Sequence, residues 1–143
     1  MSVTSKTAKL TLAGIDGPQT MTDLRRKVRM GITFLESWRR DGRADQLAAF
    51  EIVRAQTWQW LYHGVVLDWD DPEGSYHVSR DLVGRVFDEE LARLLPEVPD
   101  DVAAARLATA AREARALFTE TEYRPFPPST APVLGDDVLG LAA

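Results

Sequence analysis

Apolar residues recur at three- and four-residue spacing in four stretches of the chain, which is the period of an amphipathic helix. Thr20 and Asp23 have the spacing of a capping box before the first stretch, and Gly42 is a good stop after it. Ser79 is placed to cap the third helix. The predicted helices cover residues 20 or 22 to 42, 45 to 64, 79 to 95, and 100 or 101 to 119. No stretch is a confident strand, so the predicted fold class is all-α.

The second predicted helix, capped by Asp45 and stopped by Gly64, is apolar around most of its circumference and holds two of the four tryptophans. We therefore expect a bundle of four to five helices around this central, Trp-rich helix. Polar groups on a buried helix need partners, and Glu51 and Arg54 have the i,i+3 spacing of an ion pair. Its two predicted faces are Leu47, Phe50, Arg54, Trp58 and Leu61, and beside them Ala48, Ile52, Ala55 and Gln59.

The domain organisation follows from the polar and proline-rich ends. Residues 1–19 are small and polar and predict a flexible lead-in. Residues 20–135 form the helical domain, in which the aromatic residues of the proline-rich stretch 123–128 are expected to fold back onto the bundle. Residues 136–143 are expected to be a loose tail.

Composition narrows the partners of this domain. The 143 residues have a net charge of -5, which argues against a nucleic-acid partner. There is no Cys for a disulfide or a thiolate nucleophile, and no apolar run long enough to span a membrane, so a cytoplasmic location is the default. A basic stripe on the first helix, from Arg25 to Arg40, is better explained as a solvated face than as an anion site.

The motifs of common active sites are missing from the sequence. Four acids, Asp68, Asp70, Asp71 and Glu73, lack the Gly and terminal Glu of an EF-hand loop, so no metal site is predicted. There is no Gly-rich phosphate loop, no metal-spaced His pair and no Ser-centred elbow. The residue pattern by itself indicates a helical domain and no particular chemistry.

One block on the second helix resembles a known family. Glu51-Ile52-x-Arg54-Ala55-Gln56-x-Trp58-Gln59-Trp60 is similar to the Glu-Ile-Ser-Arg-x-x-Ile-Trp-Gln-Trp signature of the C-terminal helical domain of malate synthases. The stretches from Val28 to Trp38 and from Phe87 to Leu91 also resemble that domain. The resemblance covers roughly residues 20 to 135 and implies the same helical fold.

The resemblance also implies a division of labour. Malate synthases condense acetyl-CoA with glyoxylate: a TIM barrel holds Mg²⁺ and glyoxylate, while the C-terminal domain closes over it and supplies an Asp that removes the methyl proton. A TIM barrel needs more residues than this chain contains. We therefore expect no cofactor on this chain itself, with Mg²⁺ and acyl-CoA held by a partner barrel.

The family's catalytic Asp has no direct counterpart. It lies five residues before the signature Glu, and the same count back from Glu51 reaches Gln46, whose amide is no general base. Asp45 is one residue earlier and displaced by about 100° around a helix. Asp41, in the turn, is the other candidate. The turn is shorter than the family's and lacks its Cys and Pro.

Three functional hypotheses follow. The first is the lid subunit of a split malate-synthase-like enzyme, with Asp45 as base on a TIM-barrel partner. The second is a non-catalytic interaction or regulatory module that has lost the family base. The third is a repurposed stand-alone protein, in which the bare barrel-facing surface forms a pocket or drives self-association. The residues predicted to line that pocket are Asp45, Gln46, Glu51, Arg54 and Tyr62.

Overall fold

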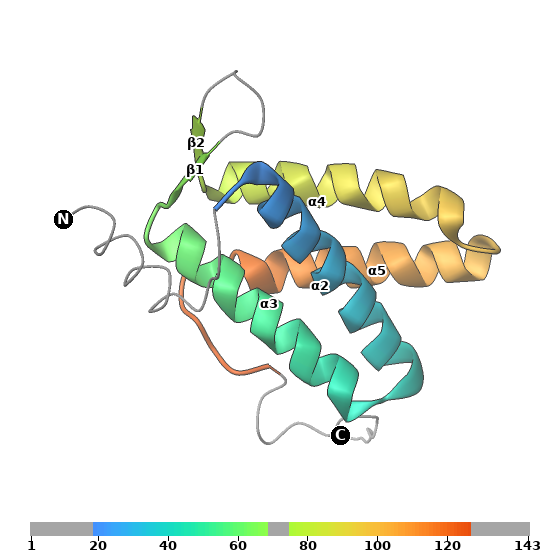
Figure 1. The fold of residues 1–143 in the computed structure, drawn as a ribbon. Coiled ribbons are helices and arrows are strands. Elements are labelled where there is room, and N and C mark those ends of the chain that lie inside the picture. The colour runs from blue at the N-terminus through green and yellow to red at the C-terminus, as the bar shows by residue number, and fades with distance from the viewer. Residues whose placement is uncertain (1–18, 69–74, 127–143) are drawn as a thin grey trace.

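Four α-helices carry the fold, which confirms the predicted all-α class (Figure 1). The computed structural model describes residues 19–68 and 75–126. The elements are α2 (Met21–Asp41), α3 (Ala44–Tyr62), β1 (Val66–Asp68), β2 (Ser75–His77), α4 (Arg80–Leu94), the 3₁₀ turn η1 (Leu95–Glu97) and α5 (Asp101–Phe118). None of the helices in these ranges combines the length and apolarity needed to cross a bilayer.

Three of the four helices begin at a side-chain cap. The oxygens of Thr20, Ser79 and Asp100 accept the backbone N–H three residues later. The fourth, α3, was expected to begin with Asp45 as its cap, and this expectation is wrong. Arg43 takes the cap position without a side-chain hydrogen bond, and Asp45 lies in the first turn. Gly42, in the left-handed conformation at φ 69°, ends α2 so abruptly that only two residues separate the helices.

α2 and α5 each contact the three other helices, and α3 lies along one side of α2 (Figure 1). The Trp-rich helix therefore does not have helices on every side. Phe50 and Arg54 of the first predicted face are buried as expected. Val53 and Trp60, which belong to neither predicted face, are also buried, whereas Ile52 of the second face is 58% exposed. The sequence pattern predicted burial around most of α3 because its polar residues are few, and the structure buries one side.

A short hairpin joins α3 to α4 and was not predicted. β1 and β2 pair antiparallel, with Val66 opposite His77 and Leu67 opposite Tyr76. Leu67 is fully buried and anchors the hairpin to the core. Strands of three residues are too short for the period-2 alternation to be recognised in sequence. Most of the acid-rich segment, residues 69–74, lies outside the described residues.

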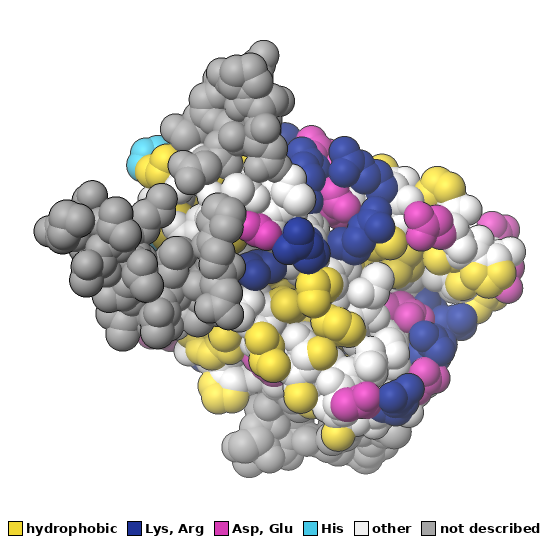
Figure 2. All heavy atoms as spheres, viewed as in Figure 1, with side chains coloured by type: hydrophobic (Ala, Val, Ile, Leu, Met, Phe, Trp, Pro, Cys, Tyr) yellow, Lys and Arg dark blue, Asp and Glu magenta, His cyan; other side chains and the backbone are white. Residues whose placement is uncertain are grey.

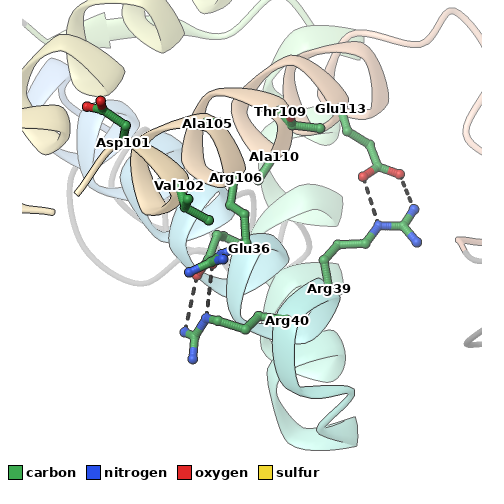
Figure 3. A pocket seen from close by; sticks show the side chains of 10 residues that line it. All are labelled: Glu36, Arg39, Arg40, Asp101, Val102, Ala105, Arg106, Thr109, Ala110 and Glu113. Carbon is green, nitrogen blue, oxygen red and sulfur yellow. Dashed lines mark hydrogen bonds and ion pairs between the residues drawn. The ribbon is translucent and has the colours of Figure 1, made fainter. Parts of the chain in front are cut away.

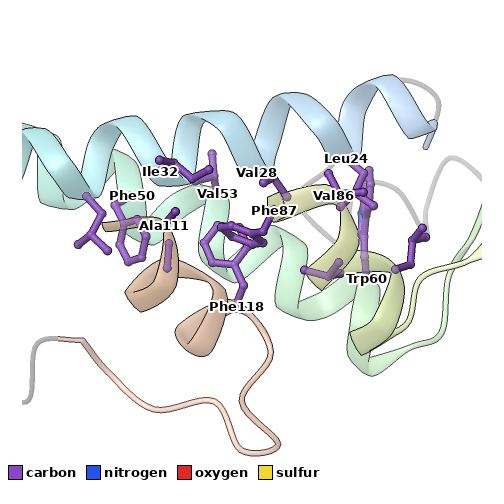
Figure 4. Packing of buried hydrophobic residues seen from close by; sticks show 14 of the residues in the cluster. Leu24, Val28, Ile32, Phe50, Val53, Trp60, Val86, Phe87, Ala111 and Phe118 are labelled. Carbon is purple, nitrogen blue, oxygen red and sulfur yellow. The ribbon is translucent and has the colours of Figure 1, made fainter. Parts of the chain in front are cut away.

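The core is centred on Phe118 at the end of α5 (Figure 4). Its ring lies 5.9 Å from the ring of Phe50 and 5.1 Å from that of Phe87, measured between centroids. It also lies against Gly31 of α2, where an added Cβ would meet the ring at 2.5 Å. One side chain of α5 thus packs on the three other helices, and α2 needs a glycine to leave room for its ring.

A buried carboxylate connects α2 with α4. Glu90 is 2% exposed and accepts hydrogen bonds from Arg25 at 3.3 Å, Arg29 at 3.2 Å and Arg93 at 3.0 Å. Figure 2 shows basic side chains gathered around acidic ones where these two helices meet. A carboxylate removed from water needs such partners. The predicted basic stripe on α2 is therefore largely used for pairing within the bundle.

The chain after α5 turns back over α2 and α3. We name residues 119–126 the return segment. Its Phe126 ring packs edge-on against Trp38 at 5.8 Å and Phe50 at 5.9 Å, between centroids. The predicted fold-back of the aromatic residues is confirmed for Tyr123 and Phe126. The tail 136–143, and the lead-in 1–19 except Gln19, lie outside the described residues.

We expect Gly31→Ala to destabilise the bundle. Alanine favours a helix by up to about 1 kcal/mol over glycine, but overpacking a core costs about 1–3 kcal/mol, and the buried Phe118 ring has little room to move. Gly84→Ala is the matched control, because its Cβ meets only the flexible end of Arg115. Urea denaturation should show a lower midpoint for Gly31→Ala and no loss for Gly84→Ala. Equal midpoints for both variants would contradict this account of the packing.

Candidate functional site

The five residues predicted for the site all lie on α3, but the structure does not bring them together. Asp45 lies in the first turn of the helix and Tyr62 in the last. The two residues are seventeen positions apart, which corresponds to about 26 Å of helix. The residues occupy three separate places, at the start, middle and end of α3. A single pocket lined by all five is therefore not formed by this chain alone.

Asp45 is an exposed carboxylate held by a neighbour. Its side chain is 61% exposed and pairs with Arg43, which donates from Nε to Oδ1 at 3.2 Å and from Nη2 to Oδ2 at 2.8 Å. The hydrogen bond from Arg43 is the main cause that lowers the pKa of Asp45. The carboxylate therefore stays ionised at neutral pH, but it is a weaker base than an ordinary Asp. Gln46 lies half-buried beside it.

Asp41, the alternative base, is also an exposed carboxylate paired with an arginine, and it is the last residue of α2. It is exposed and accepts a hydrogen bond from Arg40 at 2.9 Å. Both candidate carboxylates thus lie at the α2–α3 turn, accessible to a partner and each paired with an arginine.

Arg54, in the middle of α3, is fully buried and binds the return segment. Its Nη1 donates to Glu51 at 2.9 Å. Its Nη2 donates to the backbone oxygen of Arg124 at 2.6 Å and to the carboxylate of Glu120 at 3.2 Å. The guanidinium also lies 4.3 Å from the ring centroid of Tyr123. Arg54 thus holds the return segment to α3 through one hydrogen bond to a backbone oxygen, one to a carboxylate and one aromatic contact.

Tyr123 completes this cluster. Its hydroxyl donates to Oε1 of Glu51 at 3.2 Å, the same oxygen that Arg54 contacts. Burial, followed by the charge of Glu51, raises the pKa of Tyr123, so the phenol remains a protonated donor. The predicted Glu51–Arg54 ion pair is confirmed, and its partners explain why both polar residues are tolerated on a packed helix.

Tyr62, at the end of α3, belongs to an aromatic surface. Its ring stacks on Trp58 at 4.9 Å, and Trp58 meets Tyr123 edge-on at 5.3 Å, both between centroids. The indole N–H of Trp58 donates to the backbone oxygen of Glu120 at 2.8 Å. A hollow of about 370 Å³ lies here, lined by Trp58, Leu61, Tyr62, Arg80, Glu120 and Thr121.

A larger groove, of about 530 Å³, lies between the end of α2 and the first half of α5 (Figure 3). Its floor is apolar, with Val102 and Ala105 from α5. Its guanidinium groups are already paired, Arg39 with Glu113 and Arg40 with Glu36. A ligand would have to exchange with these carboxylates to use the arginines. In the described part of the chain, no three His, Asp or Glu side chains are placed to hold a metal ion.

The fold and the α3 residues can now be compared with known proteins. A family described as "Malate synthase, C-terminal" matches residues 18–130. This match spans most of the chain, and the chain belongs to that family. The malate synthase of Arabidopsis thaliana is 35% identical over 133 residues, which are 88% of this chain and 21% of that protein. No solved structure matches.

Glyoxysomal malate synthases give similar results. The Cucumis sativus protein is 39% identical over 89 residues, which are 57% of this chain and 15% of the relative. The Zea mays protein is 36% identical over 104 residues, which are 67% of this chain and 18% of that protein. The chain thus spans about a fifth or less of the length of these relatives.

Sequence reasoning missed the partners of Arg54 that come from the return segment. Glu120 and Tyr123 contact it across more than sixty residues of chain, so helical periodicity cannot reveal them. The burial of Glu90 was missed for another reason. The helical period assigns the neighbouring Leu91 to the apolar face and gives no sign that Glu90 is buried as well. The available signal for a buried ion pair was an acidic residue next to the apolar face of one helix, together with several arginines on another helix.

We expect Arg54→Met to destabilise the protein by about 3 kcal/mol, since it leaves Glu51 and Glu120 without their buried partner. The return segment should detach, and chymotrypsin should cut after Tyr123 faster than in the parent protein. Arg93→Met is the matched control, because Glu90 keeps two other arginines and Arg93 is 58% exposed. An unchanged rate of chymotryptic cleavage after Tyr123 would contradict the proposed role of Arg54.

We expect Arg43→Gln to raise the pKa of Asp45 toward its ordinary value, because the hydrogen bond that lowers it is lost. A lowered pKa means that any stabilisation from the pair is present above the ordinary Asp range and lost as the pH falls through the lowered value. Side-chain carboxyl NMR titration measures the change, with Arg112→Gln on α5 as control. No difference between the two variants would show that another group sets the pKa of Asp45.

Proposed function

We propose that this chain is the lid of a malate-synthase-like enzyme and closes over a separate TIM-barrel subunit. The observation that carries the proposal is the family match over residues 18–130, combined with a match to about a fifth or less of each relative's length. A protein that retains this domain's fold needs a second body to supply the remaining parts of the site. The substrates proposed are an acyl-CoA and a 2-oxo acid similar to glyoxylate.

In this proposal Asp45 is the base that removes a proton next to the thioester carbonyl, and the resulting carbanion attacks the 2-oxo acid. Its exposure at the α2–α3 turn supports the proposal, because the carboxylate can enter a site on another surface. Its pairing with Arg43 is an obstacle that docking would have to remove. Desolvation in a closed site would then raise the pKa of Asp45 and make it a stronger base.

The same pairing favours the second candidate, a helical interaction module without chemistry. Arg43 and Arg40 each occupy one candidate carboxylate, and Gln46 stands where the ungapped family count expects the base. In that case the chain docks on its partner and changes the partner's stability or assembly without taking part in proton transfer.

The test begins with purification of the protein from its own cells under gentle conditions and mass spectrometry of co-eluting chains. We expect a stoichiometric TIM-barrel protein, and the pair should release CoA from acetyl-CoA in the presence of glyoxylate. Asp45→Asn should lower kcat by about 100-fold or more and leave the complex intact. Asp41→Asn is the matched comparison, because it removes the other carboxylate of the same turn.

The outcomes separate the candidates. If neither Asp variant lowers kcat in an active complex, the chain is the interaction module. If no barrel protein co-purifies and none binds when co-expressed, the lid proposal fails.

A further inference from the structure

A second apolar stripe runs along α3, on the side away from the core. Exposed or half-buried residues recur along it at spacings of three, four, three, four and three, which is the seam of a coiled coil. Its centre is uncharged, and its bulkiest members are Ile52 at 58% and Tyr62 at 68% exposed. We name these residues the outer stripe: Asp45, Ala48, Ile52, Ala55, Gln59 and Tyr62.

The centre of the outer stripe lies about 145° around the helix from the centre of the buried residues Phe50, Val53 and Trp60, at 100° per residue. On the face shown in Figure 2, hydrophobic side chains lie along α3 and the middle of α2. A helix of a single-domain protein ordinarily places polar residues on the side opposite its core. The fold of the described residues therefore does not explain the apolar seam.

We propose that the outer stripe binds the outer stripe of a second copy of this chain, as an antiparallel helix pair with two-fold symmetry. This proposal does not rest on the proposed function. Because both proposals assign a partner to Asp45, the two-fold pair has to open before the chain closes over a barrel. The stripe is complementary to itself when read backwards, as a two-fold interface requires. Ile52 then lies opposite Ala55 of the second copy, and Ala48 lies opposite Gln59 of the second copy.

Each opposed pair joins a large side chain with a small one, so knobs meet holes along the seam. At both ends, Asp45 lies opposite Tyr62 of the second copy, which places a carboxylate acceptor against a phenol donor. A parallel pairing would instead put Ile52 against Ile52 and Asp45 against Asp45, where like charges repel. The chemistry of the stripe therefore selects the antiparallel arrangement. The net charge of -5 does not prevent it, because Asp45 is neutralised by Arg43 and the centre is uncharged.

The first experiment measures the mass of the full chain by sedimentation equilibrium over micromolar concentrations. We expect a dimer, and Ile52→Asp should raise its dissociation constant about tenfold or more, since it places a charge at the centre of the seam. Val102→Asp on α5 is the matched control, because Val102 is 63% exposed and lies outside the stripe. Circular dichroism verifies that both variants fold.

The second experiment tests the orientation in a chain that has no native Cys. The double variant A48C/Q59C should form a disulfide-linked dimer on mild oxidation, because these positions face each other in the antiparallel pair. They cannot join within one chain, since eleven residues of helix separate them by about 16 Å. The single variant A48C should form no disulfide-linked dimer under the same oxidation, because its thiol has no second thiol opposite it.

Three results would overturn the proposal. The first is a monomer throughout the concentration range. The second is a dimer that Ile52→Asp leaves unchanged. The third is efficient crosslinking of A48C alone, which indicates parallel pairing. A monomer whose Ile52→Asp variant loses a co-purifying barrel protein would assign the stripe to that partner and would leave the proposed function standing.

Discussion

The structure depends on one buried cation. Arg54 has no exposed surface, and its guanidinium is satisfied by Glu51 from its own helix and by Glu120 and the Arg124 backbone from the return segment. A charge so far from water is tolerated only with such a set of partners. The return segment in turn brings Phe126 to Trp38 and Phe50, so this ionic contact determines where an aromatic part of the core is placed. The position of Arg54 in the family signature thus has a structural explanation and needs no catalytic one.

Much of the fold was predictable because helical starts and stops are local chemistry. Thr20, Ser79 and Asp100 cap their helices as their residue types suggest, and Gly42 ends α2. Asp45 misled because a carboxylate in the first turn and one at the cap look alike in sequence. The side of α3 that faces water could not be predicted either, since both of its sides are apolar. Burial is decided by neighbouring helices, and the sequence does not say where they lie.

The contact between Glu51 and Arg54 was predictable, but the placement of the five predicted site residues along α3 was not. The family signature identifies Glu51 and Arg54, and the structure joins them. It separates both from Asp45 and Tyr62, because a rigid helix keeps its two ends apart. The two-residue connection between α2 and α3 leaves no loop to carry a base toward a substrate. Any chemistry at this turn therefore needs a second surface brought to it, which agrees with a domain that works by docking.

The position of Phe118 makes the four helices one cooperative unit. Its ring packs on Gly31, Phe50 and Phe87, so removing any one helix exposes a surface that the other two share with α5. No pair of helices keeps its full set of contacts without the remaining two. The free energy of opening one helix is therefore close to that of opening the whole bundle. A partner that pulled on the neighbouring return segment would act on a side chain that all four helices share, and the bundle would respond as a rigid body.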